Sequence, residues 1–341
     1  MIRSTPAEVG APLSRRKRAR LGDFIASKAT GIAALALVAL LVAFLINFAL
    51  GSREGLRVLG FRYLWTTGII AKFSVQGAFP YIFGTLVTSA IALILGVPVA
   101  VGLALFVTEV CPRRIRAAVA TLSDMLAAIP SVVYGMWGFF VLTPWMDATL
   151  EPWLHKVLGP IPGFGRLFQG NTFGSDILTA GVILSIMILP IVTSISREIL
   201  SAVPRELRDG AYALGATRYE VIRGVTLPFS RAGIVGASML GLGRALGETI
   251  AVIMVIGNNA SVQASLFGKG YTIPSFIAGS FGESGTNGLD RSLLTLMALI
   301  LVVISLGFAA LARLFVRRIN QRARIAFDTG SARSAWMSRS R

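Results

Sequence analysis

The residues best suited to chemistry are an arginine and a glutamate inside a long apolar stretch, Arg244 and Glu248 in the segment GLGRALGETIAV. A guanidinium carries a fixed charge and a planar fork of donors that suits a tetrahedral oxyanion, and a nearby carboxylate can orient it. On a helix, their four-residue spacing puts both side chains on one face, where they partly neutralise each other. The pair predicts either an ion pair that locks two helices together or a polar path for an anion.

Hydroxyl groups in two further apolar segments extend the set of side chains that could contact an anion. They are Thr85, Thr88 and Ser89 in PYIFGTLVTSA, and Ser131 and Tyr134 in AAIPSVVYGMWG. The structural alternative is that these hydroxyls bond helix carbonyls or bridge neighbouring helices. The chain has one cysteine and one histidine, which excludes a His/Cys metal cluster, so the sequence implies no metal and no cofactor.

The elements that position these side chains must lie in a membrane. Of the 341 residues, 54% are hydrophobic and only 14% are charged, whereas about a quarter of the residues in a soluble domain are charged. Six apolar blocks are each long enough to cross the ~30 Å hydrocarbon core as a helix. They lie between Lys28 and Arg53, Lys72 and Glu109, Arg116 and Asp147, Asp176 and Arg197, Arg231 and Lys269, and Arg291 and Arg313.

The basic residues predict which side of the membrane each connecting segment faces. With the N-terminus inside, 24 of the 33 Lys and Arg residues fall in inner segments and 8 in outer ones, and Arg244 lies within a span. This excess indicates cytoplasmic N- and C-termini. It also makes the net charge of +17 mainly a topology signal, so nucleic-acid binding is not expected.

We therefore expect an all-α, multi-pass protein of a cytoplasmic (inner or plasma) membrane. A basic cytoplasmic tail (1–29) precedes a first, uncleaved transmembrane helix (30–52), because its apolar block exceeds the usual h-region of a signal peptide. A transmembrane core follows (79–316), and a second basic cytoplasmic tail (317–341) ends the chain.

The inner segment 203–228, VPRELRDGAYALGATRYEVIRGVTLP, predicts two short helices. Gly215 supplies a turn between them, and Thr217 with Glu220 matches a capping box. Pro228 is expected to end the second helix, because the residue before a proline avoids the α region. Ala211 and Leu214 lie among charges and form an apolar patch that could dock on a partner, although the segment could also simply join two spans.

The same segment resembles the coupling segment of ABC importer permeases, in which an acidic residue, two small residues, a glycine and a closing Leu-Pro recur. Asp209, Gly210, Ala211, Gly215 and Pro228 occupy the matching positions, with Asp in place of Glu and Gly in place of the first Ala. The resemblance implies docking on an ATPase. That ATPase must be a separate subunit, because the chain has no G-x-x-x-x-G-K-[ST] phosphate loop.

The motif GRALGET followed by Ile-Ala-Val is similar to that of the PstC-type permeases of phosphate ABC importers, whose intramembrane Arg and Glu match Arg244 and Glu248. The resemblance covers roughly residues 79–314. It implies the six-span type I (MetI-like) fold, with a first helix wrapping a five-helix core, and half of a pathway for inorganic phosphate. The implied partners are a second, PstA-like permease, a PstB-like ATPase dimer and an extracytoplasmic, PstS-like phosphate-binding protein.

Three other functions remain open on the sequence. A related ABC permease for molybdate or sulfate would share the coupling segment, and only GRALGET separates it from a phosphate permease. An ion-coupled secondary transporter would need no ATPase, and a purely structural subunit would transport nothing.

Overall fold

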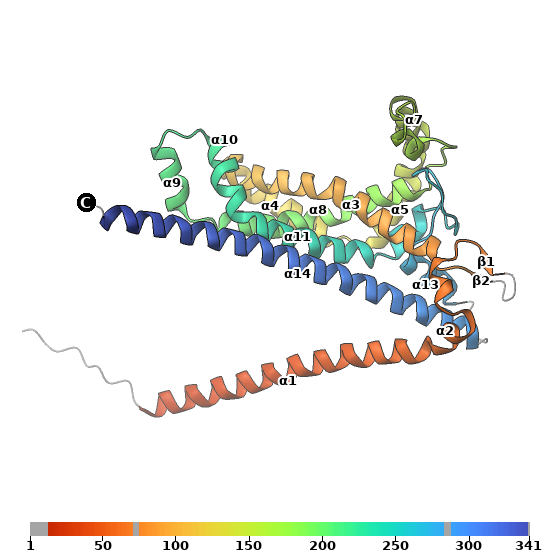
Figure 1. Ribbon diagram of the computed structural model, residues 1–341, viewed down its shortest axis with the longest axis horizontal. Coiled ribbons are helices and arrows are strands. Elements are labelled where there is room, and N and C mark those ends of the chain that lie inside the picture. Colours follow the sequence, from red (N-terminus) through yellow and green to blue (C-terminus); the bar gives the residue numbers. More distant parts are fainter. Residues whose placement is uncertain (1–12, 71–74, 283–287, 340–341) are drawn as a thin grey trace, which may run out of the picture.

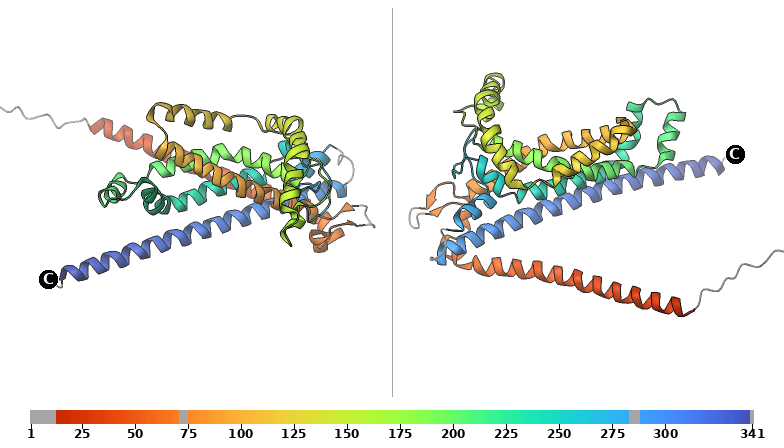
Figure 2. Two further views of the ribbon diagram at one scale, coloured as in Figure 1. Left: turned by 90° about the horizontal axis from the view of Figure 1, so that it is seen from above. Right: turned by 180° about the vertical axis from the view of Figure 1, so that it is seen from behind.

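The computed structural model describes residues 13–70, 75–282 and 288–339. Residues 1–12 of the expected N-terminal tail and residues 340–341 of the expected C-terminal tail therefore lie outside the described residues. The described chain is an elongated bundle of long helices with shorter elements at its two ends (Figures 1 and 2). The helices α9 and α10 stand at one end, and α7 and the two short strands stand at the other (Figure 1).

The helices follow one another along the chain with few strands between them. The α-helices are α1 (Leu13–Gly51), α2 (Arg53–Leu59), α3 (Phe79–Leu105), α4 (Arg113–Ala127), α5 (Ser131–Trp137), α6 (Thr143–Trp145), α7 (Glu151–Leu158), α8 (Ile177–Ser201), α9 (Arg205–Ala213), α10 (Arg218–Val221), α11 (Leu227–Leu246), α12 (Ile250–Val255), α13 (Ile273–Ser280) and α14 (Gly288–Arg339). Wider π turns are η2 (Phe106–Val110), η3 (Gly138–Leu142), η4 (Met146–Leu150) and η6 (Ile222–Thr226), and 3₁₀ turns are η1 (Phe61–Trp65) and η5 (Phe164–Phe168). Strands β1 (Ile69–Ile70) and β2 (Val75–Gln76) pair antiparallel, with Ile69 opposite Gln76.

Five of the described helices are long and apolar enough to cross a membrane, and a sixth span exists if one bent pair is counted. The five are Phe24–Leu59, Phe79–Val110, Ile177–Ser201, Arg218–Leu246 and Gly288–Ile319. The bent pair is Arg114–Ala127 with Ser131–Leu158, which meet at 90°. The multi-pass helical fold expected from the sequence is thus confirmed.

Two of the predicted spans are broken rather than continuous. The block after Arg116 bends at Pro130, which precedes α5 and cannot donate a backbone N–H to the preceding turn. The block after Arg231 breaks between Leu246 and Ile250, where Gly247 ends α11 and a separate helix α12 begins. A charge-free run gives the length of an apolar segment but does not reveal a break within it.

Helices α3 and α8 form the tightest part of the core. A Cβ on Gly96 of α3 would lie 2.9 Å from Ile188 and 3.0 Å from the Ser185 carbonyl oxygen of α8, so only glycine permits this approach. Thr193 on α8 also donates a hydrogen bond of 3.2 Å to the carbonyl of Ala100 on α3. The two helices therefore behave as one rigid unit.

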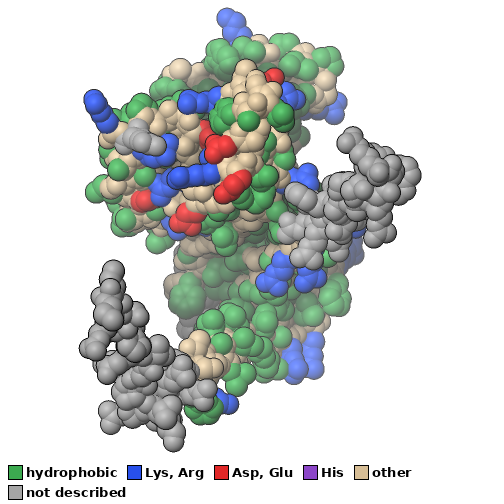
Figure 3. All heavy atoms as spheres, turned by 90° about the vertical axis from the view of Figure 1, so that its left-hand side faces the viewer, with side chains coloured by type: hydrophobic (Ala, Val, Ile, Leu, Met, Phe, Trp, Pro, Cys, Tyr) green, Lys and Arg blue, Asp and Glu red, His purple; other side chains and the backbone are tan. Residues whose placement is uncertain are grey.

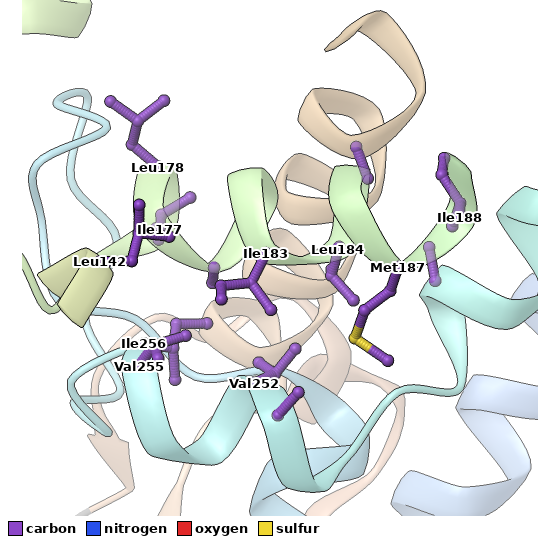
Figure 4. Packing of buried hydrophobic residues seen from close by; sticks show 14 of the residues in the cluster. Leu142, Ile177, Leu178, Ile183, Leu184, Met187, Ile188, Val252, Val255 and Ile256 are labelled. Atoms are coloured by element: carbon purple, nitrogen blue, oxygen red, sulfur yellow. The ribbon is translucent and has the colours of Figure 1, made fainter. Parts of the chain in front are cut away.

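Helix α12 closes the other side of this core. Figure 4 shows Ile183 and Leu184 of α8 facing Val252, Val255 and Ile256 of the α12 region, and all five are at most 1% exposed. This packing holds the end of α12 fixed beside α8.

The first helix does not wrap this chain's own core, so that expectation is wrong for the described chain. Helix α1 diverges from α14 and stays separate from the bundle (Figures 1 and 2), and its most apolar window buries no residue. The two helices meet at one end, where Ser292 donates a hydrogen bond of 2.7 Å to the carbonyl of Gly51. An isolated helix keeps its backbone hydrogen bonds within itself, so lipid can surround it without cost to the backbone.

Candidate functional site

Arg244 lies in the last turn of α11, two residues before the helix ends at Leu246. Its side chain is half-buried, and its Nε has less than 1 Å² exposed and no hydrogen-bond partner among the described residues. A guanidinium away from water normally pairs with a carboxylate or carbonyl, because an unpaired buried donor costs about 1–3 kcal/mol or more. Arg244 thus has unused donor capacity at its Nε.

Glu248 does not pair with Arg244, and the expected shared helix face is wrong. The helix ends between the two residues, and neither ion pair found among the described residues joins them. Glu248 Oε1 instead accepts a hydrogen bond of 3.3 Å from the backbone N–H of Ala251 in the first turn of α12. Its charge stabilises the start of α12, because helix N-termini carry unsatisfied donors.

Tyr134 braces the bend of one broken span and lies near Arg244 on the other. It lies on α5 just after the Pro130 bend, and its hydroxyl donates a hydrogen bond of 2.9 Å back to the carbonyl of Leu126 on α4. It is also near enough to Arg244 for the two groups to interact electrostatically. The sequence-predicted residues Tyr134 and Arg244 are therefore brought together from segments more than a hundred positions apart.

The two breaks are packed against each other through Gly135. A Cβ at this position would lie 2.8 Å from Met254 Sδ and 2.9 Å from Ala251 Cα on α12. Helix α5 therefore lies directly on α12, next to the turn that carries Glu248. Ser131 begins α5 and is half-buried at this bend.

Thr85 and Thr88 lie on α3 with their hydroxyls occupied. The Thr85 hydroxyl donates a hydrogen bond of 2.7 Å to the carbonyl of Tyr81. It also accepts one of 2.9 Å from the N–H of Ile273, which starts α13. The Thr88 hydroxyl donates a hydrogen bond of 2.8 Å to the carbonyl of Gly84. Both are 1% exposed. The geometry favours the structural alternative for these two, and their contact with an anion stays a prediction.

The segment predicted to dock on an ATPase projects from one end of the bundle (Figure 1). Gly215 has a φ of +84°, which a residue with a Cβ rarely adopts, and the Thr217–Glu220 capping box is present. Leu214 at the tip is 91% exposed, Asp209 and Gly210 are exposed, and Ala211 is half-buried. Docking of this exposed tip on an ATPase stays a prediction.

Pro228 does not end the second short helix, so that expectation is wrong. It lies in the first turn of α11, and the chain is helical from Arg218 to Leu246. The π turn η6 immediately precedes α11, and a wider turn tolerates the backbone hydrogen bond that proline cannot make.

Charged side chains gather on the end of the bundle that carries α9 and α10 (Figure 3). One ion pair there joins Arg197 of α8 to Asp124 of α4 at 3.2 Å. The partner of Asp124 therefore lies on another helix. This contact ties the short helix α4 to the rigid α3–α8 unit.

At the opposite end, two carboxylates that the sequence did not single out are both fully buried. Glu151 Oε2 accepts backbone N–H groups of Phe173 and Gly174 at 3.2 Å each, and Asp176 Oδ1 caps α8 through the N–H of Thr179 at 2.8 Å. Burial, followed by the charge of Glu151, raises the pKa of Asp176 to about 8. Spacing along the chain gives no signal for such a pair.

Comparison with known proteins places this geometry in a family. Residues 96–325 match the family described as "Binding-protein-dependent transport system inner membrane component". The chain is 41% identical over 318 residues to the phosphate transport system permease protein PstC of Xylella fastidiosa, covering 93% of this chain and 97% of that protein. It is 42% identical over 292 residues to PstC of Haemophilus influenzae, covering 86% and 92%.

A solved bacterial alginate ABC transporter, in complex with a periplasmic protein bound to an alginate pentasaccharide, shares the fold with a TM-score of 0.57 at 18% identity. The match covers 87% of this chain and 97% of that one. The expected type I ABC importer fold is confirmed by this likeness, and multiple apolar helices agree with a multi-pass protein of the bacterial inner membrane. The chain belongs to the binding-protein-dependent transport system inner membrane components, among their PstC-type permeases.

Proposed function

We propose that this chain is the permease subunit of an ATP-driven importer of inorganic phosphate and forms half of its translocation pathway. The observation that carries the proposal is Arg244, a half-buried intramembrane arginine whose Nε has no partner among the described residues, beside Tyr134 where two spans break. Helix breaks inside membranes expose polar backbone, and they mark the ion and substrate sites of many transporters.

Arg244 supplies a positive charge and hydrogen-bond donors that replace the hydration a phosphate oxyanion loses when it leaves water. Its planar fork can donate two parallel hydrogen bonds to phosphate, and such charge-assisted bonds are worth roughly twice a neutral one. The Tyr134 hydroxyl is a donor already committed to Leu126, so it holds the bend beside the arginine. Glu248 fixes the turn before α12 and adds a negative charge that discourages tight trapping of the anion.

Each proposed partner is matched to a surface of the chain. The exposed tip around Leu214 fits a groove on an ATPase subunit, which supplies the ATP hydrolysis. A second, homologous permease covers the half-buried Arg244 and completes the pathway, and an extracytoplasmic phosphate-binding protein delivers the anion at the end that carries α7. The excess of basic residues in the segments on the α9 side supports a cytoplasmic location for that end and for both termini.

The test measures phosphate uptake by the whole complex reconstituted in vesicles. The ATPase subunits face the vesicle interior, which contains ATP. Phosphate import is expected, with sulfate and molybdate competing weakly. Arg244→Ala should abolish import while the subunits still co-purify, and Arg231→Ala on the same helix, an exposed arginine, is the matched control. Import at the normal rate by Arg244→Ala would refute the site, and preferential import of sulfate or molybdate would refute the substrate.

A further inference from the structure

The helix α9 has almost no apolar attachment to the rest of the protein. None of its residues is buried, and only Arg208 and Ala211 are less than exposed. Gly210, in the middle of the helix, has no neighbouring atom within 4 Å of the position a Cβ would take. A helix packed this lightly needs specific polar contacts to hold a fixed position relative to its neighbours.

Arg208 makes those contacts, and it reaches two different transmembrane helices. Its Nη2 donates a hydrogen bond of 2.6 Å to the carbonyl of Leu200, in the last turn of α8. Its Nη1 lies 3.0 Å from Oε1 of Glu109, in the π turn η2 that continues α3. A lysine could not replace both contacts, because they use the two terminal nitrogens of one rigid fork.

The ion pair is shielded from water, unlike the charges around it. The side chain of Arg208 is 20% exposed and that of Glu109 is 8% exposed. Exposed ion pairs contribute little, but removing one partner of a shielded pair leaves an uncompensated charge. The turn that holds Glu109 is itself stabilised, because Arg116 donates a hydrogen bond of 2.8 Å to the carbonyl of Thr108.

Helices α3 and α8 are the rigid unit held together at Gly96 and Thr193. A force applied to α9 therefore enters both members of this unit through one guanidinium. We infer that Arg208 and Glu109 are positioning residues that transmit the motion of α9 to the α3–α8 unit, so that ATP hydrolysis opens the pathway efficiently while this ion pair is intact. The inference rests on the proposed ATPase docking of α9 and adds the residues through which that docking acts.

The experiment measures phosphate imported per ATP hydrolysed by the complete reconstituted complex. Arg208→Gln and Glu109→Gln should lower this ratio by about two- to thirtyfold, the range for residues that carry coupling between distant sites. The ATP hydrolysis rate and the co-purification of the ATPase should change little, because Arg208 faces the membrane helices and the exposed tip of the segment is untouched. Arg114→Gln, which removes an exposed arginine of α4, is the charge-matched control and should keep the unmodified ratio.

A charge swap distinguishes transmission of motion from mere stability. Glu109→Arg alone places two guanidinium groups together and should give the lowest ratio. Combining Glu109→Arg with Arg208→Glu restores the opposite charges and should recover most of the ratio, apart from what the lost bond to Leu200 contributes.

The inference is overturned if the single Gln variants keep the unmodified ratio. It is equally overturned if import and ATP hydrolysis fall together and the charge swap recovers neither, because the pair would then only support the fold. Failure of the proposed function is distinguishable from both, since the unmodified complex itself would import no phosphate.

Discussion

Replacing Asp176 by asparagine should remove a pH dependence from the stability of this protein. Asp176 and Glu151 are both fully buried, and one oxygen of each, Oδ2 and Oε1, has no partner in the hydrogen-bond network of the described residues. Two buried carboxylates in contact cannot both ionise at low cost, so the pair holds a proton that the unfolded chain releases. The exposed Asp147 adds further negative charge beside Glu151.

The sign of the effect follows from the pKa of Asp176, which burial raises from 3.8 to about 8. Between these values the folded state binds one proton more than the unfolded state, so the free energy of unfolding decreases as the pH rises. The slope is about 1.4 kcal/mol per pH unit, so the loss reaches up to about 6 kcal/mol before it levels off above pH 8. Stability from this carboxyl is therefore fully present at acidic pH and is lost toward alkaline pH.

Asparagine is a neutral replacement of the same shape. Its Oδ1 can still accept the N–H of Thr179, and its amide can donate to Glu151 Oε1 in place of the shared proton. Thermal unfolding of the purified protein from pH 5 to 9 should show a melting temperature that falls with pH in the unmodified chain and falls less steeply in Asp176→Asn. The control Glu54→Gln removes an exposed carboxylate at the same end and should keep the wild-type slope. Equal slopes in wild type and Asp176→Asn would refute the shared proton.

Three further outcomes are expected. Arg244→Lys keeps the charge but loses the planar fork, so phosphate import should slow by about 10- to 100-fold, the value of one charge-assisted hydrogen bond; an unchanged initial rate would exclude bidentate binding. Gly135→Ala places a methyl group 2.8 Å from Met254 Sδ and should destabilise the protein by about 1–3 kcal/mol, which lowers the melting temperature. The control Gly236→Ala has no atom within 4 Å of the new methyl group and should keep the wild-type melting temperature. Similar melting of both variants would contradict the close packing of α5 on α12. Thr217→Ala removes a helix cap worth about 1 kcal/mol and should weaken co-purification of the ATPase; full retention would show that the capping box is dispensable for docking.

Several features could be predicted because they depend on residues close together in the chain. The apolar blocks, the excess of basic residues on one side, and the Thr217–Glu220 capping box all arise from local energetics of burial, charge and backbone donors. The turn at Gly215 could be predicted in the same way, since a positive φ favours glycine. These features were sufficient to indicate a helical membrane protein with two short helices joined at Gly215, and only the resemblance of the two motifs to a family implied a permease.

The relation between Arg244 and Glu248 could not be predicted from their spacing. Four residues apart predicts a shared helix face, but only if the helix continues, and here it ends at Leu246. Glu248 accepts a hydrogen bond at the start of α12, where backbone N–H groups lack helical partners, and does not pair with Arg244. The break thus separates the two charges and leaves the guanidinium available.

The sequence by itself determined which segments cross the membrane, on which side their charges gather and which motifs the chain shares with its family, because these depend on composition and on neighbours along the chain. Only the tertiary structure decided which distant residues come near one another: Tyr134 and Arg244, Glu151 and Asp176, and Arg208 and Glu109. The reason is that such contacts depend on where helices bend and how closely glycines let them approach. Neither property can be read from the distance between residues in the chain.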